Sequence, residues 1–156
     1  MPDVQSAIFD VLVRTVADRA RAAGVFAQIE LGNAGLSCSA KNSAAPAWYR
    51  LRPESGRLWV ELVTPDRWLS QSIEQDLVHT GDKLPDLLDE ELVELGLPPA
   101  ALPVEHFRSE DKLYTFRSPL PFTGPGNEDA VALAAGMLLA YEACFRRLGD
   151  MEEKED

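Results

Sequence analysis

Residues Asn127 to Leu148, NEDAVALAAGMLLAYEACFRRL, form the last long apolar stretch of the chain. Apolar residues recur in this stretch three and four positions apart, which is the spacing of one helix face. They are Ala130, Leu133, Ala134, Met137, Tyr141, Cys144, Phe145 and Leu148. A second apolar strip runs along the other side of the same helix. A helix that is apolar on two sides must be covered twice, so we expect a sheet under one side and another element on the other.

The second strip consists of Val131, Ala135 and Leu138. Its residues are small enough for another helix to approach closely, so it is a candidate self-association surface between two copies of the chain. The alternative is that the first helix of the same chain covers it. Periodicity alone does not distinguish the two arrangements.

Composition limits the class of protein. The chain has 156 residues, 46% of them apolar, which predicts a single folded domain over residues 1–148 and an acidic disordered tail over residues 149–156. The formal net charge of -11 argues against binding to nucleic acid or to anionic membranes. Cys38 and Cys144 lack metal or disulfide spacing, so we expect both to stay reduced. The first residues do not resemble a signal peptide, and we expect a cytoplasmic protein.

The periodicity of the chain predicts four helices and two clear hairpins, with further strands near the start. The predicted helices are Asp3–Ala23, Pro65–His79, Lys83–Leu95 and the last stretch. The early strands are Val25–Leu31 and Leu36–Ala40. The first hairpin joins Ala47–Arg52 to Arg57–Val63, and the second joins Val104–Arg108 to Leu113–Arg117. Strands grouped in antiparallel meanders, with helices beside them, indicate an α+β fold. We expect an antiparallel sheet of about five or six strands, with the N- and C-terminal helices packed on one face.

Side-chain spacing extends these predictions to individual residues. The helix that begins near Pro65 is expected to bury Trp68, Leu69, Ile73 and Leu77, and the next helix Leu84, Leu87, Leu88, Leu92 and Leu95. Alternation in the second hairpin predicts two faces. Phe107, Tyr114 and Phe116 are expected on one of them, and Val104, His106 and Leu113 on the other.

The order of these elements resembles class I type III secretion chaperones and the related YbjN-like proteins. The local resemblance is strongest from Lys112 to Leu148, where a strand ending in LYTFRSPLP leads through a short polar loop into the last helix. The chain departs from that pattern in its strand Leu36–Ala40 and in having two helices after the first hairpin. The resemblance implies a non-enzymatic fold that often dimerises and holds a partner polypeptide.

The first hairpin provides the best candidate binding site. With Pro53 to Gly56 as the turn, its outward face carries Trp48, Arg50, Arg52, Arg57, Trp59 and Glu61, and Arg50 lies opposite Trp59 in a cation–π pair. Tryptophan and arginine are enriched at binding hot spots, so Trp48, Arg50, Arg52, Trp59 and Glu61 are the candidate partner-binding residues. The alternatives are that the following helix covers the tryptophans as core or that the arginines shield them.

The remaining motifs give weaker indications of a functional site than the first hairpin does. His79 lies near Asp76 and Asp82, which allows an alternative function as a small enzyme or ligand-binding domain. It lacks the spacing of a metal site, and no catalytic motif accompanies it, so we expect no cofactor and no bound metal. The Gly124–Asn127 loop has the position of an anion site but is followed by two acids. The acidic run Asp86 to Glu94 is either a solvated helix face or a receiver for a basic partner segment.

The sequence therefore favours a chaperone-like or adaptor protein that binds another polypeptide, as a homodimer, through the first hairpin.

Overall fold

The computed structural model describes residues 4–32, 35–41, 43–121 and 128–149, and only the backbone of residues 4–8. Its helices are α1 (Val4–Ala23), α2 (Arg67–Thr80), α3 (Leu84–Glu94) and α4 (Glu128–Phe145), and its strands are β1 (Phe26–Gly32), β2 (Gly35–Ala40), β3 (Trp48–Glu54), β4 (Arg57–Thr64), β5 (Glu105–Arg108) and β6 (Tyr114–Pro119). Asp3 and Asn127, where the first and last helices were predicted to begin, lie outside the described residues, as do the rest of the Gly124–Asn127 loop and tail residues 150–156.

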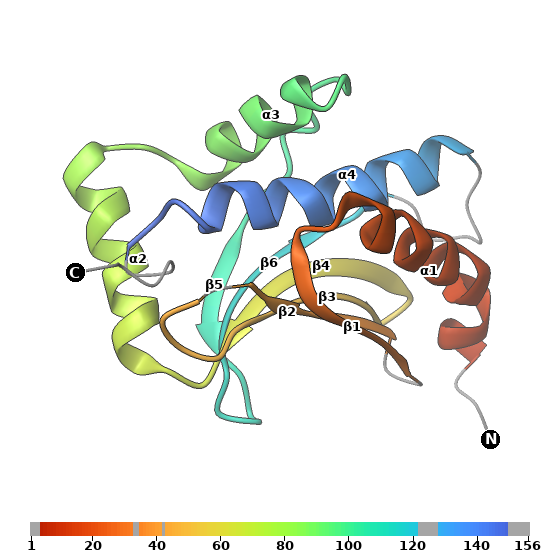
Figure 1. The fold of residues 1–156 in the computed structure, drawn as a ribbon, viewed down its shortest axis with the longest axis horizontal. Coiled ribbons are helices and arrows are strands. Elements are labelled where there is room, and N and C mark those ends of the chain that lie inside the picture. The colour runs from red at the N-terminus through yellow and green to blue at the C-terminus, as the bar shows by residue number, and fades with distance from the viewer. Residues whose placement is uncertain (1–3, 33–34, 42, 122–127, 150–156) are drawn as a thin grey trace.

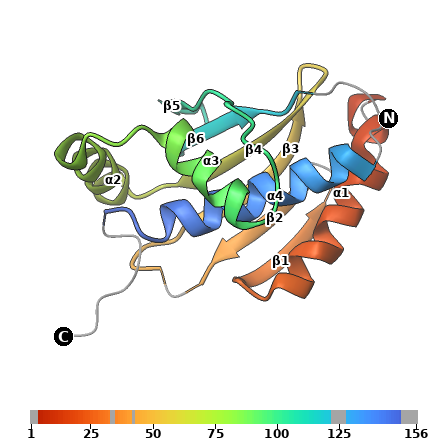
Figure 2. The ribbon, with the colours of Figure 1, turned by 90° about the horizontal axis from the view of Figure 1, so that it is seen from above.

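The six strands form one antiparallel sheet in the order β1-β2-β3-β4-β6-β5. Helix α1 packs along β1, β2 and β3, and α4 packs across β3 and β4 (Figure 1). Both helices lie on the same face of the sheet, so the predicted α+β architecture is confirmed. Helix α3 lies over α4 on the side away from the sheet (Figure 2), which makes a third layer. None of the helices in the described ranges is long and apolar enough to cross a membrane.

The core lies between the sheet and α4, as the apolar pattern of the last stretch requires. Tyr141 and Phe145 are fully buried, and Phe116 of β6 contacts Phe145 with ring centroids 5.1 Å apart. Burial raises the pKa of Tyr141, and its hydroxyl lies 2.6 Å from the Ser118 hydroxyl, so its polar end is hydrogen-bonded inside the core. The prediction that α4 is covered on two sides is therefore confirmed, by the sheet and by the α1 and α3 helices.

The start of α2 differs from the prediction. The cap is Asp66, whose carboxylate accepts a 2.8 Å hydrogen bond from the Leu69 N–H, and the helix begins at Arg67. The predicted start at Pro65 is therefore two residues early, and the Thr64 hydroxyl just before it donates to the Pro46 carbonyl at 2.7 Å. Thr64 therefore ties the end of β4 to the chain before β3.

Two expected core residues are exposed. Trp68 is 76% exposed and Leu95 is 48% exposed, so the prediction that they are buried is wrong. Helix α2 packs through Leu69 and Ile73, and one residue along a helix turns the side chain by about 100°. The neighbouring Trp68 therefore faces away from the core. Leu95 lies just past the end of α3, where the chain leaves the helix.

Candidate functional site

The outer face of the sheet is the side opposite α1, α3 and α4 (Figure 1). Leu51, Val60 and Leu62 are fully buried towards the helices, so alternation places their neighbours on this outer face. These neighbours are the five candidate partner-binding residues Trp48, Arg50, Arg52, Trp59 and Glu61. The face predicted for them is therefore correct, and none of the helices in the described ranges packs over them.

The register of the β3–β4 hairpin differs from the prediction by two residues. Glu54 pairs with Arg57, so the turn is the two-residue Ser55–Gly56, and both residues have positive φ, 54° and 78°. Arg50 consequently lies opposite Glu61, and the expected Arg50–Trp59 cation–π pair is not formed. A two-residue shift keeps every side chain on its face, which is why the face was predicted correctly although the pairs were not.

Glu61 is the centre of one charge cluster on the outer face. Its side chain is only 3% exposed, although it is on the face that lacks a helix. Arg50 Nη2 lies 3.3 Å from Oε2, and Arg52 Nε lies 2.9 Å from Oε1 without hydrogen-bond geometry, so this second contact is ionic only. Arg52 Nη2 also lies 3.8 Å from Glu54 Oε1, so the two half-buried guanidinium groups share the hidden carboxylate of Glu61, and Arg52 has a second, more exposed acid as a partner.

Arg117 of β6 is the centre of a second cluster. Its guanidinium carbon lies 3.9 Å from the Trp59 ring centroid and 4.9 Å from that of Phe107. Its Nε donates to Glu105 at 2.8 Å, and Nη1 donates to Glu54. Burial disfavours its charge, but the hydrogen bonds to Glu105 and Glu54 outweigh burial and raise the pKa of Arg117. Trp59 is fixed in turn, because its Nε1 donates to the Glu54 carbonyl at 3.2 Å.

The second cluster was missed from the sequence because the second hairpin was assigned the wrong faces. In the structure Phe107 pairs with Thr115, and His106 pairs with Phe116, so Phe107 belongs to the outer face and His106 to the helix side. The pairing of Glu105 with Arg117 places opposite charges side by side. That charge pattern was the signal available in the sequence.

Trp48 lies at the other end of the candidate site. It pairs with Val63 of β4 and with Ser39 of β2, and its side chain is partly exposed. No ring stacking or cation–π contact of Trp48 occurs within the described part of the chain. The outer face therefore combines a partly open tryptophan, an Arg50–Arg52 edge and an arginine held between two aromatic rings.

The candidate self-association strip on α4 is covered within the chain. Ala135 is 6% exposed, Leu138 is 1% exposed, and Val131 is half-buried against the core. A Cβ added at the neighbouring Gly136 would come 2.3 Å from a methyl group of Leu97, just beyond α3. The strip therefore does not offer a free surface, because the segment after α3 is packed closely against α4.

The two histidines occupy different environments. His79 is exposed at the end of α2, and nearby Asp76 accepts a hydrogen bond from the Gly149 N–H at 3.0 Å. His106 Nε2 lies 3.0 Å from the Ser70 hydroxyl and its Nδ1 lies 2.5 Å from the Glu74 carboxylate, so the three side chains are connected in the order serine, histidine, acid. Ser70 is only 2% exposed. A nucleophile must reach its substrate, so this cluster acts here as a clip between α2 and β5.

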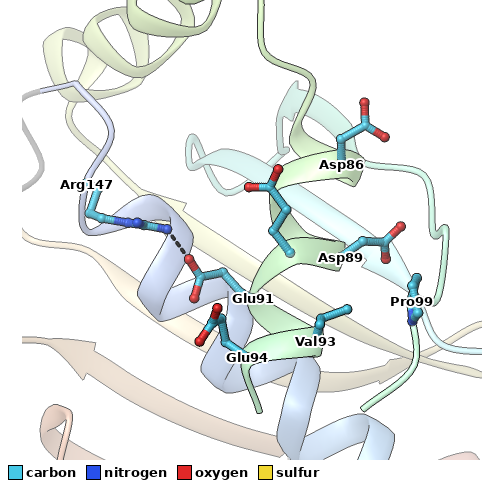
Figure 3. A pocket seen from close by; sticks show the side chains of 8 residues that line it. Asp86, Asp89, Glu91, Val93, Glu94, Pro99 and Arg147 are labelled. Carbon is cyan, nitrogen blue, oxygen red and sulfur yellow. Dashed lines mark hydrogen bonds and ion pairs between the residues drawn. The ribbon is translucent and has the colours of Figure 1, made fainter. Parts of the chain in front are cut away.

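The acidic run of α3 borders an open hollow that Pro99 and Arg147 complete (Figure 3). Two of its acids have structural partners: Asp89 accepts from the Ala100 and Ala101 N–H groups at 2.9 and 3.1 Å, and Glu91 pairs with Arg147. Asp86, Glu90 and Glu94 are exposed. The hydrogen bonds to Asp89 hold the chain after α3 in place, and the three exposed acids form a solvated acidic surface.

No group of three or more His, Cys, Asp or Glu side chains is arranged to hold a metal ion among the residues the structure describes. Comparisons with protein-family models, with curated proteins and with solved structures find no match to this chain.

Proposed function

We propose that the protein is a non-enzymatic, chaperone-like or adaptor protein of the cytoplasm, which as a homodimer holds a segment of another polypeptide on the outer face of its sheet. The observation that supports this most is the partly open Trp48 beside the Arg50–Arg52 edge, on a sheet face without a helix. The element order, which resembles that of type III secretion chaperones, supports it independently.

The chemistry of the face defines the partner segment. The carboxylate of Glu61 is hidden, and Arg52 is also paired with Glu54, whereas the Arg50 side chain is 23% exposed, so Arg50 is the group of this edge that favours a carboxylate of the partner. Trp48 provides an aromatic surface for an apolar side chain. The partner segment is therefore acidic and apolar in alternation, and extended, so that side chains two residues apart meet the face together.

The test is selection from a displayed peptide library, followed by affinity measurement with the selected peptides. We expect enrichment of peptides in which Asp or Glu lies close to an aromatic or aliphatic residue. Trp48→Ala is expected to weaken their binding at least tenfold, as truncation of a hot-spot residue does. Trp68→Ala is the matched control, because it removes an exposed tryptophan from α2, and it is expected to leave peptide affinity unchanged.

The choice of variant follows from the contacts of Arg50. Arg50→Glu would place a second carboxylate against the buried Glu61, so loss of binding in that variant would not separate function from folding. Trp48→Ala removes no ion pair. Equal loss of binding in the Trp48 and Trp68 variants, or selection of basic peptides only, would contradict the proposed site.

The second candidate function is a small enzyme, and the Ser70–His106–Glu74 cluster is the observation in its favour. A fluorophosphonate probe tests it, because such probes label serines that a neighbouring base activates. The clip arrangement predicts no labelling of Ser70 in the folded protein. Labelling that is lost in His106→Asn would instead establish nucleophilic chemistry at Ser70.

A further inference from the structure

A row of alternating charges crosses the outer face of the sheet. Arg50 of β3 pairs with Glu61 of β4, and Glu61 pairs with Arg117 of β6. Arg117 pairs in turn with Glu105 of β5, at the edge of the sheet. Neighbouring strands lie about 4.8 Å apart, so the two arginines, which are two strands apart, are separated by roughly 10 Å. One extended segment that lies across the strands can therefore reach both arginines.

The acids that pair with these arginines differ in burial. The Glu61 side chain is almost fully hidden, and taking its arginines away would leave a buried charge without compensation. The side chains of Glu54 and Glu105, which both pair with Arg117, are 43% and 51% exposed. Exposed ion pairs contribute little to stability, because water solvates both charges when the pair opens. Glu54 and Glu105 can therefore leave Arg117 easily, whereas Glu61 is a fixed part of the fold.

The surroundings of Arg117 keep it in position when its acids leave. Its guanidinium lies between the rings of Trp59 and Phe107, and these contacts involve no carboxylate. The Trp59 Nε1 donates to the backbone carbonyl of Glu54, so the ring does not depend on the Glu54 side chain. Glu54 Oε1 also lies 3.8 Å from Arg52 Nη2, which gives the displaced carboxylate a second partner on its own strand. Arg117 is thus a preorganised cation whose occupants are exchangeable.

We propose that Arg117 is a second carboxylate site for the partner segment, which Glu54 and Glu105 occupy until a partner is bound. This inference rests on the proposed function, in which Arg50 binds the first carboxylate of the partner. Arg117 divides its donors between the two acids, with Nη1 donating to Glu54 and Nε to Glu105. One partner carboxylate can instead accept two parallel hydrogen bonds from the same guanidinium. The partner segment therefore carries two acids, one for each arginine.

The two exchangeable acids make the outer face selective. An isolated acid that meets only Arg117 must displace Glu54 and Glu105 without any other contact. A segment already held at Trp48 and Arg50 presents its second carboxylate to Arg117 at a high effective concentration. Glu54 and Glu105 therefore discriminate against acidic segments that lack the apolar anchor and the first acid.

Calorimetric titration of the full chain with a two-acid peptide, made from a sequence selected on the displayed library, tests this inference. Glu54→Gln and Glu105→Gln are each expected to tighten binding roughly three- to fivefold, the effect of removing one competing exposed ion pair. Glu30→Gln is the matched control, because it removes the same charge from the outer face of β1. Glu30 lies two strands from Arg50 on one side, as Arg117 does on the other, and its variant should change affinity by less than about twofold.

Changes in the peptide separate exchange at Arg117 from a general effect on the fold. Two further peptides each have one of the two acids replaced by glutamine. With one of these peptides the gain in the Glu54→Gln variant should disappear, because no second carboxylate is left to enter the site. An equal gain with both peptides would contradict exchange at Arg117.

A small dicarboxylate tests the same site without a peptide. Glutarate at millimolar concentration and constant ionic strength should shift the Trp59 indole N–H signal in a variant that combines Glu54→Gln with Glu105→Gln, and shift it less in Glu30→Gln. Peptide binding that neither glutamine variant tightens more than Glu30→Gln does would overturn the inference and leave the proposed function intact. Lack of peptide binding together with the glutarate shift would contradict the proposed function while supporting Arg117 as a carboxylate site. Lack of the glutarate shift in the combined variant would overturn the site itself.

Discussion

Arg117 shows how single residues stabilise the outer face. Its guanidinium combines two carboxylate partners with two aromatic rings, and a lysine can provide the charge but not the planar stack. We predict that Arg117→Lys lowers the free energy of unfolding by about 1–2 kcal/mol, measured by urea denaturation. Arg14→Lys is the control, because Arg14 is exposed and its ion pair with Asp10 lies on the surface of α1, one helical turn away. Similar losses in both variants would mean that the stack contributes little.

The two thiols give a second prediction at the scale of the residue. Burial raises the pKa of Cys38 and of Cys144 from 9.0 to about 12, and Arg21 and Arg147 only partly oppose this. Both thiols should therefore resist alkylation at pH 8 in the folded protein and react fully in denaturant. Because the unfolded chain releases these protons near pH 9 and the folded chain does not, stability should fall as the pH rises from about 9 to 12. Rapid alkylation without unfolding would contradict this.

At the scale of the element, Gly35 determines how closely β2 approaches β3. Its φ is 116°, and an added Cβ would come 2.3 Å from the Leu51 carbonyl oxygen. Gly35→Ala is therefore expected to destabilise the protein by roughly 1–3 kcal/mol. Gly32→Ala, which pairs with Gly35 across the same hairpin, meets nothing within 4 Å and should change stability by less than about 0.5 kcal/mol. Thermal denaturation of the two variants measures the difference, and equal melting temperatures would contradict the tight β2–β3 contact.

The elements also show which predictions the sequence can support. The apolar spacing of α4 and the alternation of β3 and β4 are periodic over many residues, so the fold class and the outward face of Trp48 and Arg50 could be predicted. The pairing across the hairpin depends on the turn, and Pro53–Gly56 was compatible with either of two registers.

The second hairpin and α2 were harder to predict for a different reason. Strand β5 has only four residues and its own alternation is too short to fix its faces, so Phe107 and His106 were placed on the wrong sides. Helix α2 was expected to bury Trp68 because this residue lies in the same apolar spacing as Leu69, Ile73 and Leu77. The direction of Trp68 depends on how α2 packs against β4, which the sequence does not state.

At the scale of the whole molecule, the helices cover one face of the sheet and leave the other to charged and aromatic side chains (Figure 1). Partner binding is proposed for that second face, and the outward side of α2 is a separate exposed surface. Each of these surfaces contains at least one partly or fully exposed tryptophan, Trp48 on the sheet and Trp68 on α2. The third tryptophan, Trp59, is held under Arg117. The NMR signals of the Trp48 and Trp68 indole N–H groups therefore report separately on the sheet face and on α2.

The most direct measurement is an NMR titration of the three tryptophan indole N–H signals with a peptide selected from the displayed library. If the outer sheet face binds the partner, the Trp48 signal should shift in proportion to bound peptide, and the Trp68 signal should stay in place. A shift of Trp68 with no change at Trp48 would contradict the central claim and would move partner binding to α2.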